Sequence, residues 1–173
     1  MPKKKLFKNK NKNFIETGSY LGDGIELALK SGFDIVHSIE IYDKNYNHCT
    51  QRFINDKKVN LIKGDSYIEL NNLINSKENI KKSFTYWLDG HYSGGETGIG
   101  ILEFPIMIEL EAILKRNVDN EIIYIDDMRI LRDYSDSINE NSILDLIKKY
   151  KKEFEISYEE SDYDTNDIMV IEY

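Results

Sequence analysis

Residues 14–24 read Phe14-Ile15-Glu16-Thr17-Gly18-Ser19-Tyr20-Leu21-Gly22-Asp23-Gly24. An apolar start leads to an acidic residue, and glycines follow at positions 18, 22 and 24. The stretch joins a predicted strand over residues 13–17 to a predicted helix over about residues 22–31. Glycines at such a turn let a ligand approach the backbone closely, because no side chain blocks it. The dinucleotide pattern G-x-G-x-x-G is not met, since Leu27 stands where the third glycine would be.

Strands and helices are expected to alternate along the rest of the chain. Strands are predicted over residues 35–40, 59–65, 84–89 and 121–126, and helices over about 46–55, 66–73, 103–116 and 137–151. A glycine-rich loop runs from residue 90 to residue 100. Residues 154–159 and 168–173 flank a polar turn and read as a hairpin. This order predicts an α/β fold, a doubly wound and mostly parallel sheet with helices on both faces and a C-terminal antiparallel hairpin.

Length and charge limit the domain count and the class of partner. The chain has 173 residues, enough for one domain with a proper core, which we place at residues 13–173. The formal net charge of -8 argues against a nucleic acid partner, because the phosphate backbone is bound by clustered cations. Residues 1–12 are a basic run, which we interpret as a flexible, solvated tail.

The cellular location is inferred from cysteine usage and from hydropathy. Cys49 is the only cysteine, so no internal disulfide forms, and this fits a reducing compartment. No apolar run approaches membrane-spanning length, and the N-terminal region lacks the apolar stretch of a signal peptide. We therefore expect a cytoplasmic protein that does not bind a membrane.

The acid–glycine spacing at residues 16–24 resembles motif I of class I S-adenosylmethionine-dependent methyltransferases. The resemblance covers about residues 13–173 and implies a Rossmann-like, seven-stranded sheet with S-adenosyl-L-methionine as cofactor. It also implies cofactor-binding residues at the turns that follow the strands. These are Glu16, Thr17, Gly18, Ser19, Gly22, Glu40, Asp65, Ser66 and Asp89. Ligands of an open parallel sheet sit beyond the carboxyl ends of its strands, which is where these residues are predicted to lie.

Three acids have separate expected roles at the cofactor. Glu40 ends a predicted strand and could accept hydrogen bonds from both ribose hydroxyls. By the resemblance, Asp65 lies at the adenine and accepts from its exocyclic amine; it could equally cap the following helix, and both roles are compatible. Glu16 would neutralise the methionine ammonium through water. The structural alternative for Glu16 and Glu40 is that of ordinary loop acids.

A second group of acids is expected where the predicted fourth and fifth strands end. Asp89 ends one strand and Asp126-Asp127 end the other. Three close carboxylates would raise one another's pKa values unless a cation lay between them. A hard divalent ion with oxygen ligands resolves that repulsion. The alternative is that Asp126-Asp127 caps a strand and Asp89 binds only the cofactor amine.

These segments resemble metal-dependent sugar O-methyltransferases of the macrocin O-methyltransferase type. The resemblance implies that Asp89, Asp126 and Asp127 ligate Mg²⁺ or Mn²⁺, and that His91 is the general base. It implies a sugar or glycan hydroxyl as methyl acceptor. Five residues could shape the acceptor pocket, namely Tyr92, Ser93, Glu96, Thr97 and Arg129.

The chain departs from that family in size, because macrocin-type enzymes carry longer N-terminal parts that help to cover the acceptor. A short acceptor, an exposed glycan end or a homodimer with a subunit-shared site would each fit. A catechol-like or other small diol is the rival acceptor. A non-catalytic binding module on the same fold is a different class, which cofactor binding would test.

Overall fold

The computed structural model describes residues 7, 11–92, 94–95, 97–134 and 138–173. Its strands and helices follow the predicted alternation. In chain order they are β1 (Asn13–Thr17), α1 (Asp23–Lys30), β2 (Ile35–Glu40), α2 (Asp43–Arg52), β3 (Val59–Lys63), α3 (Ser66–Ile74), β4 (Phe84–Leu88), α4 (Ile106–Leu114), β5 (Ile122–Ile125), α5 (Met128–Tyr134), α6 (Glu140–Tyr150), β6 (Glu155–Glu159) and β7 (Ile168–Glu172).

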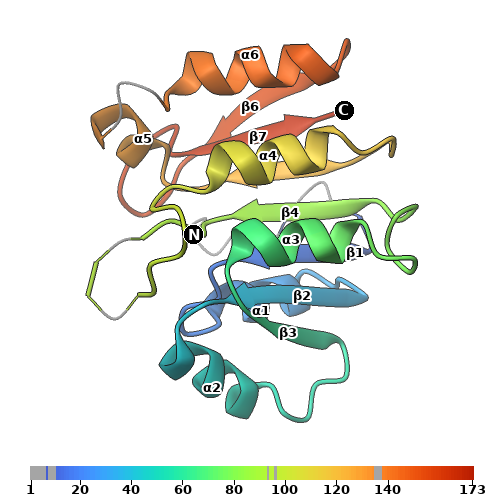
Figure 1. Ribbon diagram of the computed structural model, residues 1–173, viewed down its shortest axis with the longest axis vertical. Coiled ribbons are helices and arrows are strands. Elements are labelled where there is room, and N and C mark those ends of the chain that lie inside the picture. Colours follow the sequence, from blue (N-terminus) through green and yellow to red (C-terminus); the bar gives the residue numbers. More distant parts are fainter. Residues whose placement is uncertain (1–6, 8–10, 93, 96, 135–137) are drawn as a thin grey trace.

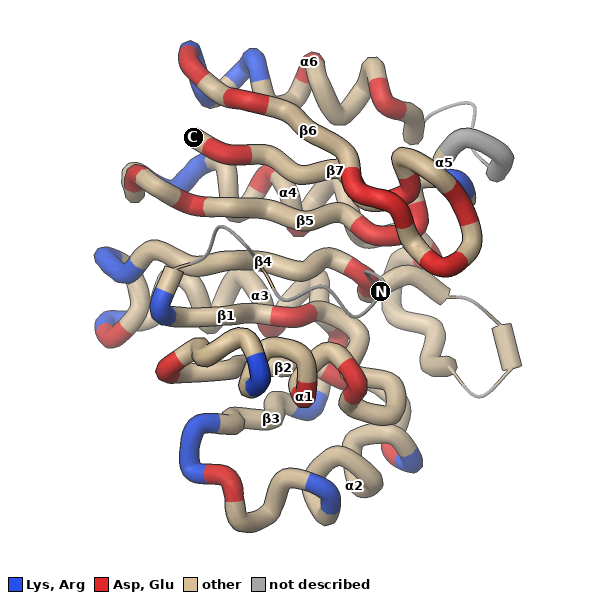
Figure 2. Tube along the Cα trace, turned by 180° about the vertical axis from the view of Figure 1, so that it is seen from behind, with Lys and Arg blue, Asp and Glu red and all other residues tan. Residues whose placement is uncertain are grey.

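All seven of these strands form one sheet in the order β3-β2-β1-β4-β5-β7-β6. Strands β1 to β5 pair in parallel with one another, whereas β7 is antiparallel to both β5 and β6. Figure 1 shows α3, α4 and α6 on one face of the sheet, and Figure 2 shows α1 over the opposite face. The predicted fold class is therefore confirmed, including the C-terminal antiparallel hairpin.

Burial in the core holds the middle of the sheet, and the residues that follow its strands, in place. Every residue of β4 is buried, and the side chains of Tyr86 and Trp87 are fully excluded from solvent. Successive side chains of a strand point to opposite faces, so Tyr86 packs into the larger apolar cluster while Trp87 packs into the second cluster, which includes Ile25 of α1. A strand covered on both faces needs a near-continuous apolar sequence, which residues 84–88 supply apart from Thr85. The carboxyl end of β4, where Asp89 follows, is thereby fixed in place.

Helix boundaries differ from the prediction where capping decides them. Helix α4 begins at Ile106 instead of residue 103, because Pro105 occupies the N-cap position and its ring disfavours a helical conformation at the preceding residue. Helix α2 lies three residues earlier than predicted, over Asp43–Arg52, with the acidic Asp43 in its first turn. Helix α5 was not predicted at all.

Two residues of the expected N-terminal tail contact the domain. Phe7 is 7% exposed, and its ring lies 5.1–5.8 Å from the rings of Phe14, Phe33, Trp87 and Tyr124. The backbone N–H of Asn11 donates to Thr85 Oγ1 (2.9 Å), which lies on β4. At these two positions the structure differs from a free tail; residues 1–6 and 8–10 lie outside the described part of the chain.

Replacing Phe7 by alanine is expected to lower the free energy of unfolding by about 3–5 kcal/mol, because it empties a site enclosed by aromatic rings. Urea denaturation measures the change, and Ile54→Ala is the matched control. The side chain of Ile54 is 65% exposed, so its loss is expected to change stability by no more than about 0.5 kcal/mol. An unchanged urea midpoint for Phe7→Ala would remove Phe7 from the core.

Candidate active site

A cavity of about 750 Å³ opens beyond the carboxyl ends of the parallel strands. Each of the five parallel strands contributes to its wall. The contributing residues are Gly18 after β1, Glu40 of β2, Asp65 after β3, Asp89 after β4 and Asp127 after β5. This is the position in which an open parallel sheet binds its ligands.

The two predicted glycines have different structural roles. Gly18 has a φ of 82°, and a Cβ there would lie 2.4 Å from the carbonyl oxygen of Asp89. Glycine at this position therefore lets the β1 loop lie directly against the end of β4. Gly22 (φ 87°) does not line the cavity; a Cβ there would lie 2.6 Å from the ring of Phe53. Gly22 thus serves the packing of the β1 loop against the residue that follows α2.

Glu40 lines the cavity, and both of its carboxylate oxygens already accept a hydrogen bond. Oε2 accepts from the N–H of Tyr20 (2.8 Å) and Oε1 from the N–H of Tyr42 (2.7 Å). Burial raises the pKa of this carboxyl, and those backbone N–H groups oppose the rise. Each oxygen keeps a second lone pair, so Glu40 can still accept from a pair of neighbouring hydroxyls.

Glu40→Ala is expected to weaken binding of S-adenosylhomocysteine by about 1.5–3 kcal/mol, because a charged hydrogen-bond acceptor is lost. Titration calorimetry measures the affinity. The control is Asp43→Ala, which removes a carboxylate that is 89% exposed and pairs with Lys63. Equal affinities for wild type and Glu40→Ala would exclude Glu40 from the cofactor site.

Asp65 caps α3 and also holds the glycine-rich loop. Its Oδ1 accepts from the N–H of Tyr67 (3.1 Å), and its Oδ2 accepts from the N–H of Ile101 (2.6 Å). A Cβ on Gly100 would lie 2.5 Å from Oδ2, so glycine permits this approach. The expected contact with the adenine amine stays a prediction, and Ser66 lines the cavity beside Asp65.

Glu16 lies beneath the cavity wall. It is fully buried, and burial raises its pKa to about 8. Ser38 Oγ donates to Glu16 Oε2 (2.6 Å) and lies 2.6 Å from the hydroxyl of Ser19, which does line the cavity. Glu16 Oε1 has no hydrogen-bond partner within the described ranges. The connection from Glu16 to the cavity therefore runs through two serines, and its predicted contact with an ammonium is untested.

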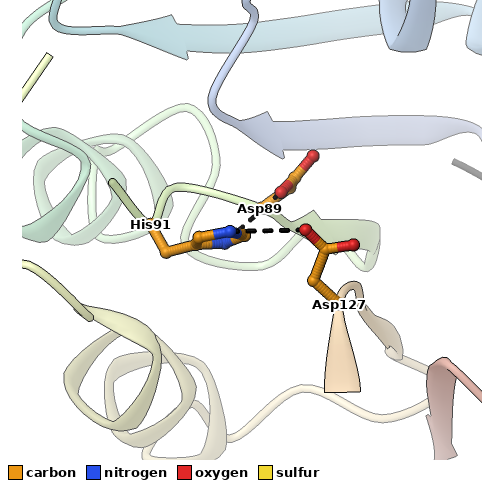
Figure 3. Close-up of side chains that lie close together, drawn as sticks. All are labelled: Asp89, His91 and Asp127. Atoms are coloured by element: carbon orange, nitrogen blue, oxygen red, sulfur yellow. Dashed lines mark ion pairs between the residues drawn. The ribbon is translucent and has the colours of Figure 1, made fainter. Parts of the chain in front are cut away.

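Three side chains converge where β4 and β5 end (Figure 3). His91 Nδ1 lies 3.5 Å from Asp89 Oδ1, and His91 Nε2 lies 3.3 Å from Asp127 Oδ2. The imidazole is stacked on the ring of Phe104, 6.0 Å away at an interplanar angle of 9°. The predicted general base is therefore placed between two of the predicted metal ligands.

Asp126 and Asp127 leave β5 in different directions. The N–H of Asp126 donates to the carbonyl of Leu88 (3.1 Å), which joins the ends of β4 and β5. Asp127 adopts a left-handed backbone (φ 59°), and its N–H donates to Asp126 Oδ1 (2.9 Å). The guanidinium of Arg129 lies 2.6 Å from Asp127 Oδ1.

The charges of this cluster strongly perturb one another. Burial raises the pKa of Asp89 well above its usual range, and the nearby Asp126 adds to the rise. Burial also raises the pKa of Asp126. The pKa of Asp127 is lowered, because His91 and Arg129 outweigh its burial. The pKa of His91 is raised, because Asp127 and Asp89 outweigh the opposing effect of burial.

The donor atoms fit a divalent cation. The ligand atoms of Asp89, His91 and Asp127 lie within 4.8 Å of one another, as do those of Asp126, Asp127 and Asp167. The carboxylate oxygens suit Mg²⁺ or Mn²⁺, whereas an imidazole ligand suits a softer ion such as Zn²⁺. The predicted ligands Asp89, Asp126 and Asp127 are therefore divided between two sets that share Asp127. Asp167, a member of the second set, was not predicted. Asp167 is fully buried and is also paired with Arg129.

The end of the cavity near Arg129 includes residues that the sequence did not suggest. Of the predicted acceptor set, Thr97 and Arg129 line the cavity and Tyr92 does not, whereas Ser93 and Glu96 lie outside the described residues. The turn between β6 and β7 contributes Asp162 and Tyr163. The Tyr163 ring is 4.6 Å from the Arg129 guanidinium. Figure 2 shows acidic residues along this turn, close to those that follow β5.

Glu109 is a second residue that sequence reasoning missed. It is 2% exposed and accepts from the hydroxyl of Thr17 (3.4 Å between Oγ1 and Oε2). Thr17 is itself buried and does not line the cavity. A signal was present, because Ile106, Glu109, Leu110 and Ile113 have the i, i+3, i+4, i+7 spacing of one helix face. Glu109 is therefore a carboxyl on an apolar face.

Neither a protein-family model nor a curated protein matches this chain. Solved structures match it in fold. A candidate methyltransferase from Streptococcus mutans, in complex with S-adenosylhomocysteine, has a TM-score of 0.64 at 13% identity, over 94% of this chain and 88% of that chain. An O-methyltransferase from Bacillus cereus, also in complex with S-adenosylhomocysteine, has a TM-score of 0.61 at 14% identity, over 92% of this chain and 72% of that chain.

A spermidine synthase from Thermotoga maritima has a TM-score of 0.57 at 11% identity, over 96% of this chain and 54% of that chain. At these identities the likeness shows the fold, which is that of class I S-adenosylmethionine-dependent methyltransferases. The fold alone does not choose between methyl transfer and another reaction. Within the described residues, no helix is long and apolar enough to cross a membrane.

Proposed function

We propose that this chain is an S-adenosylmethionine-dependent methyltransferase. The observation that supports it is one cavity lined by a residue from the end of each parallel strand, in the order of the motif pattern. Gly18 brings the β1 loop against β4, and Glu40 presents a carboxylate that can accept two hydroxyls. A cationic sulfonium suits a cavity that carries carboxylates better than a phosphate does.

We further propose O-methyl transfer to a sugar or glycan hydroxyl, assisted by a divalent metal. Asp89, Asp126 and Asp127 would hold the ion, with His91 beside them. A bound divalent ion supplies positive charge that lowers the pKa of a hydroxyl brought to it. Tyr163 and Arg129 offer a flat ring and hydrogen-bond donors at the acceptor end.

His91 is proposed as the general base. It takes the proton of the acceptor hydroxyl, and the freed oxygen forms a bond to the methyl carbon. The carbon–sulfur bond breaks, its electron pair stays on sulfur, and S-adenosylhomocysteine remains. Asp89 and Asp127 face the two ring nitrogens, at 3.5 and 3.3 Å, and stabilise the imidazolium that forms. Positioning supplies the rest of the rate enhancement.

Two alternatives are kept. A catechol-like or other small diol could replace the sugar, because both offer neighbouring hydroxyls. A non-catalytic binding module would retain the fold without turnover. The acids and glycines of the cavity favour an enzyme over the module.

Titration calorimetry with S-adenosylhomocysteine tests cofactor binding first. Absence of heat at high protein concentration would contradict the proposal. The chain would then resemble methyltransferases in fold alone. Where heat is seen, a screen of mono- and oligosaccharides and catechols with a radioactive methyl donor, with and without Mg²⁺ or Mn²⁺, identifies the acceptor class. If only catechols become labelled, the acceptor is a catechol-like diol and not a sugar.

A further inference from the structure

The carboxyl of Glu109 has no evident role in packing. It lies on the core face of α4 with 2% exposure, among the apolar side chains of Ile106, Leu110 and Ile113. Its Oε1 has no hydrogen-bond partner among the described residues. Burying such a group costs free energy that an apolar side chain would not cost. A carboxyl in this place calls for a reason beyond the core.

Glu109 is connected to the reaction loop through Thr17. The hydroxyl of Thr17 donates to Glu109 Oε2 (3.4 Å) and accepts from the backbone N–H of Asp89 (3.2 Å). Thr17 is fully buried, so water does not compete for either bond. The chain of bonds runs from α4 through the end of β1 to the residue that follows β4.

Gly90 makes the second contact between Glu109 and the loop. A Cβ on Gly90 would lie 2.9 Å from Ser66 Oγ, 3.1 Å from Glu109 Oε1 and 3.2 Å from Thr17 Cβ. The side-chain position of Gly90, between Asp89 and His91, therefore faces the Glu109 carboxyl. A larger residue here would press on the side chains of Ser66, Glu109 and Thr17.

We propose that Glu109 is a positioning residue for the loop that carries Asp89 and His91. It orients the Thr17 hydroxyl toward the Asp89 N–H and supports Gly90 from below, and it does not touch the acceptor. The kinetic part of this proposal rests on the proposed methyltransferase function, whereas the structural link does not. Asp89 is a proposed metal ligand, and removal of groups that orient metal ligands typically costs about 10–100-fold in metal affinity or activity.

The test compares apolar and conservative replacements at both ends of the link. Glu109→Leu and Thr17→Val are each expected to lower kcat by about 10–100-fold, with near wild-type affinity for S-adenosylhomocysteine. Glu109→Gln and Thr17→Ser keep an acceptor and a hydroxyl, so they are expected to restore most of the rate. The double variant is expected to be no slower than the slower single variant, because both remove one link. Glu111→Leu removes a carboxylate from the same helix and is the control.

Amide hydrogen exchange supplies a readout that does not need activity. In Glu109→Leu the Asp89 N–H is expected to exchange at least about tenfold faster, although its direct acceptor Thr17 is still present. Glu111→Leu is expected to leave it unchanged.

Wild-type kcat and wild-type Asp89 protection in Glu109→Leu would overturn the proposal. If that variant does not fold, wild-type kcat in Thr17→Val would overturn the proposal. If it does fold, additive losses of kcat in the double variant would overturn it as well. The wild-type protein could show no methyl transfer while the Asp89 N–H still exchanges faster in Glu109→Leu. That result would contradict the proposed function and leave the link from Glu109 through Thr17 to Asp89 in place.

Discussion

Removal of divalent metal is expected to abolish methyl transfer while S-adenosylhomocysteine still binds. Asp126 is buried and Asp89 is partly buried at the adjacent strand end, where their charges repel. Without the ion, the site would lose the positive charge that the proposal uses to activate a hydroxyl, an effect worth several kcal/mol. Glu40 and Gly18 lie at the other strand ends and do not depend on the ion.

The experiment strips the protein with EDTA, verifies the metal content, and then measures turnover before and after Mg²⁺ or Mn²⁺ is restored. Calorimetry on the same samples checks that the cofactor site is intact. Asp127→Asn is expected to reproduce the loss, while Asp43→Asn, which changes an exposed carboxylate outside the cavity wall, is the matched control. Full turnover in excess EDTA, with metal shown to be nil, would contradict metal dependence.

His91→Asn is expected to lower turnover by about 10²–10⁴-fold, the usual contribution of a positioned base. Asn fills part of the space above Phe104 but cannot take a proton at neutral pH. Cofactor affinity is expected to stay near that of wild type. The pH–rate profile is expected to lose its acidic limb, where the imidazole of the wild-type enzyme becomes protonated and inactive as a base.

Tyr92→Phe is the control for the neighbouring position, since it keeps the ring and removes only a hydroxyl. Near wild-type turnover in His91→Asn would mean that another group is the general base. A joint collapse of cofactor binding and turnover would instead make His91 a structural residue.

Much of the fold follows from local sequence. Strands β1 and β2 begin and end at the predicted residues, because an apolar run closed by a polar residue is visible without any partner. Parallel pairing then brings the carboxyl ends of the strands to one edge. For that reason Glu40, Asp65, Asp89 and Asp127 could be predicted to share a cavity before any contact was known.

Other features depend on segments that meet only in the folded chain. Asp167 joins Asp126 and Asp127 from the far end of the β6–β7 turn, at a distance in sequence that no motif spans. Gly22 resembles a ligand-binding glycine in sequence, but its neighbour in space is Phe53.

Glu109 shows the physical reason most directly. Local sequence determines which residues are apolar, where strands end and which turns need glycine, because these depend on nearest neighbours and backbone conformation. Whether a carboxyl is solvated or buried depends on what packs over it, and Thr17, Ser66 and Gly90 come to Glu109 from three separate strand ends. The sequence by itself therefore determined the edge of the sheet at which the candidate site lies. Only the tertiary structure decided which acids meet there and which groups hold them.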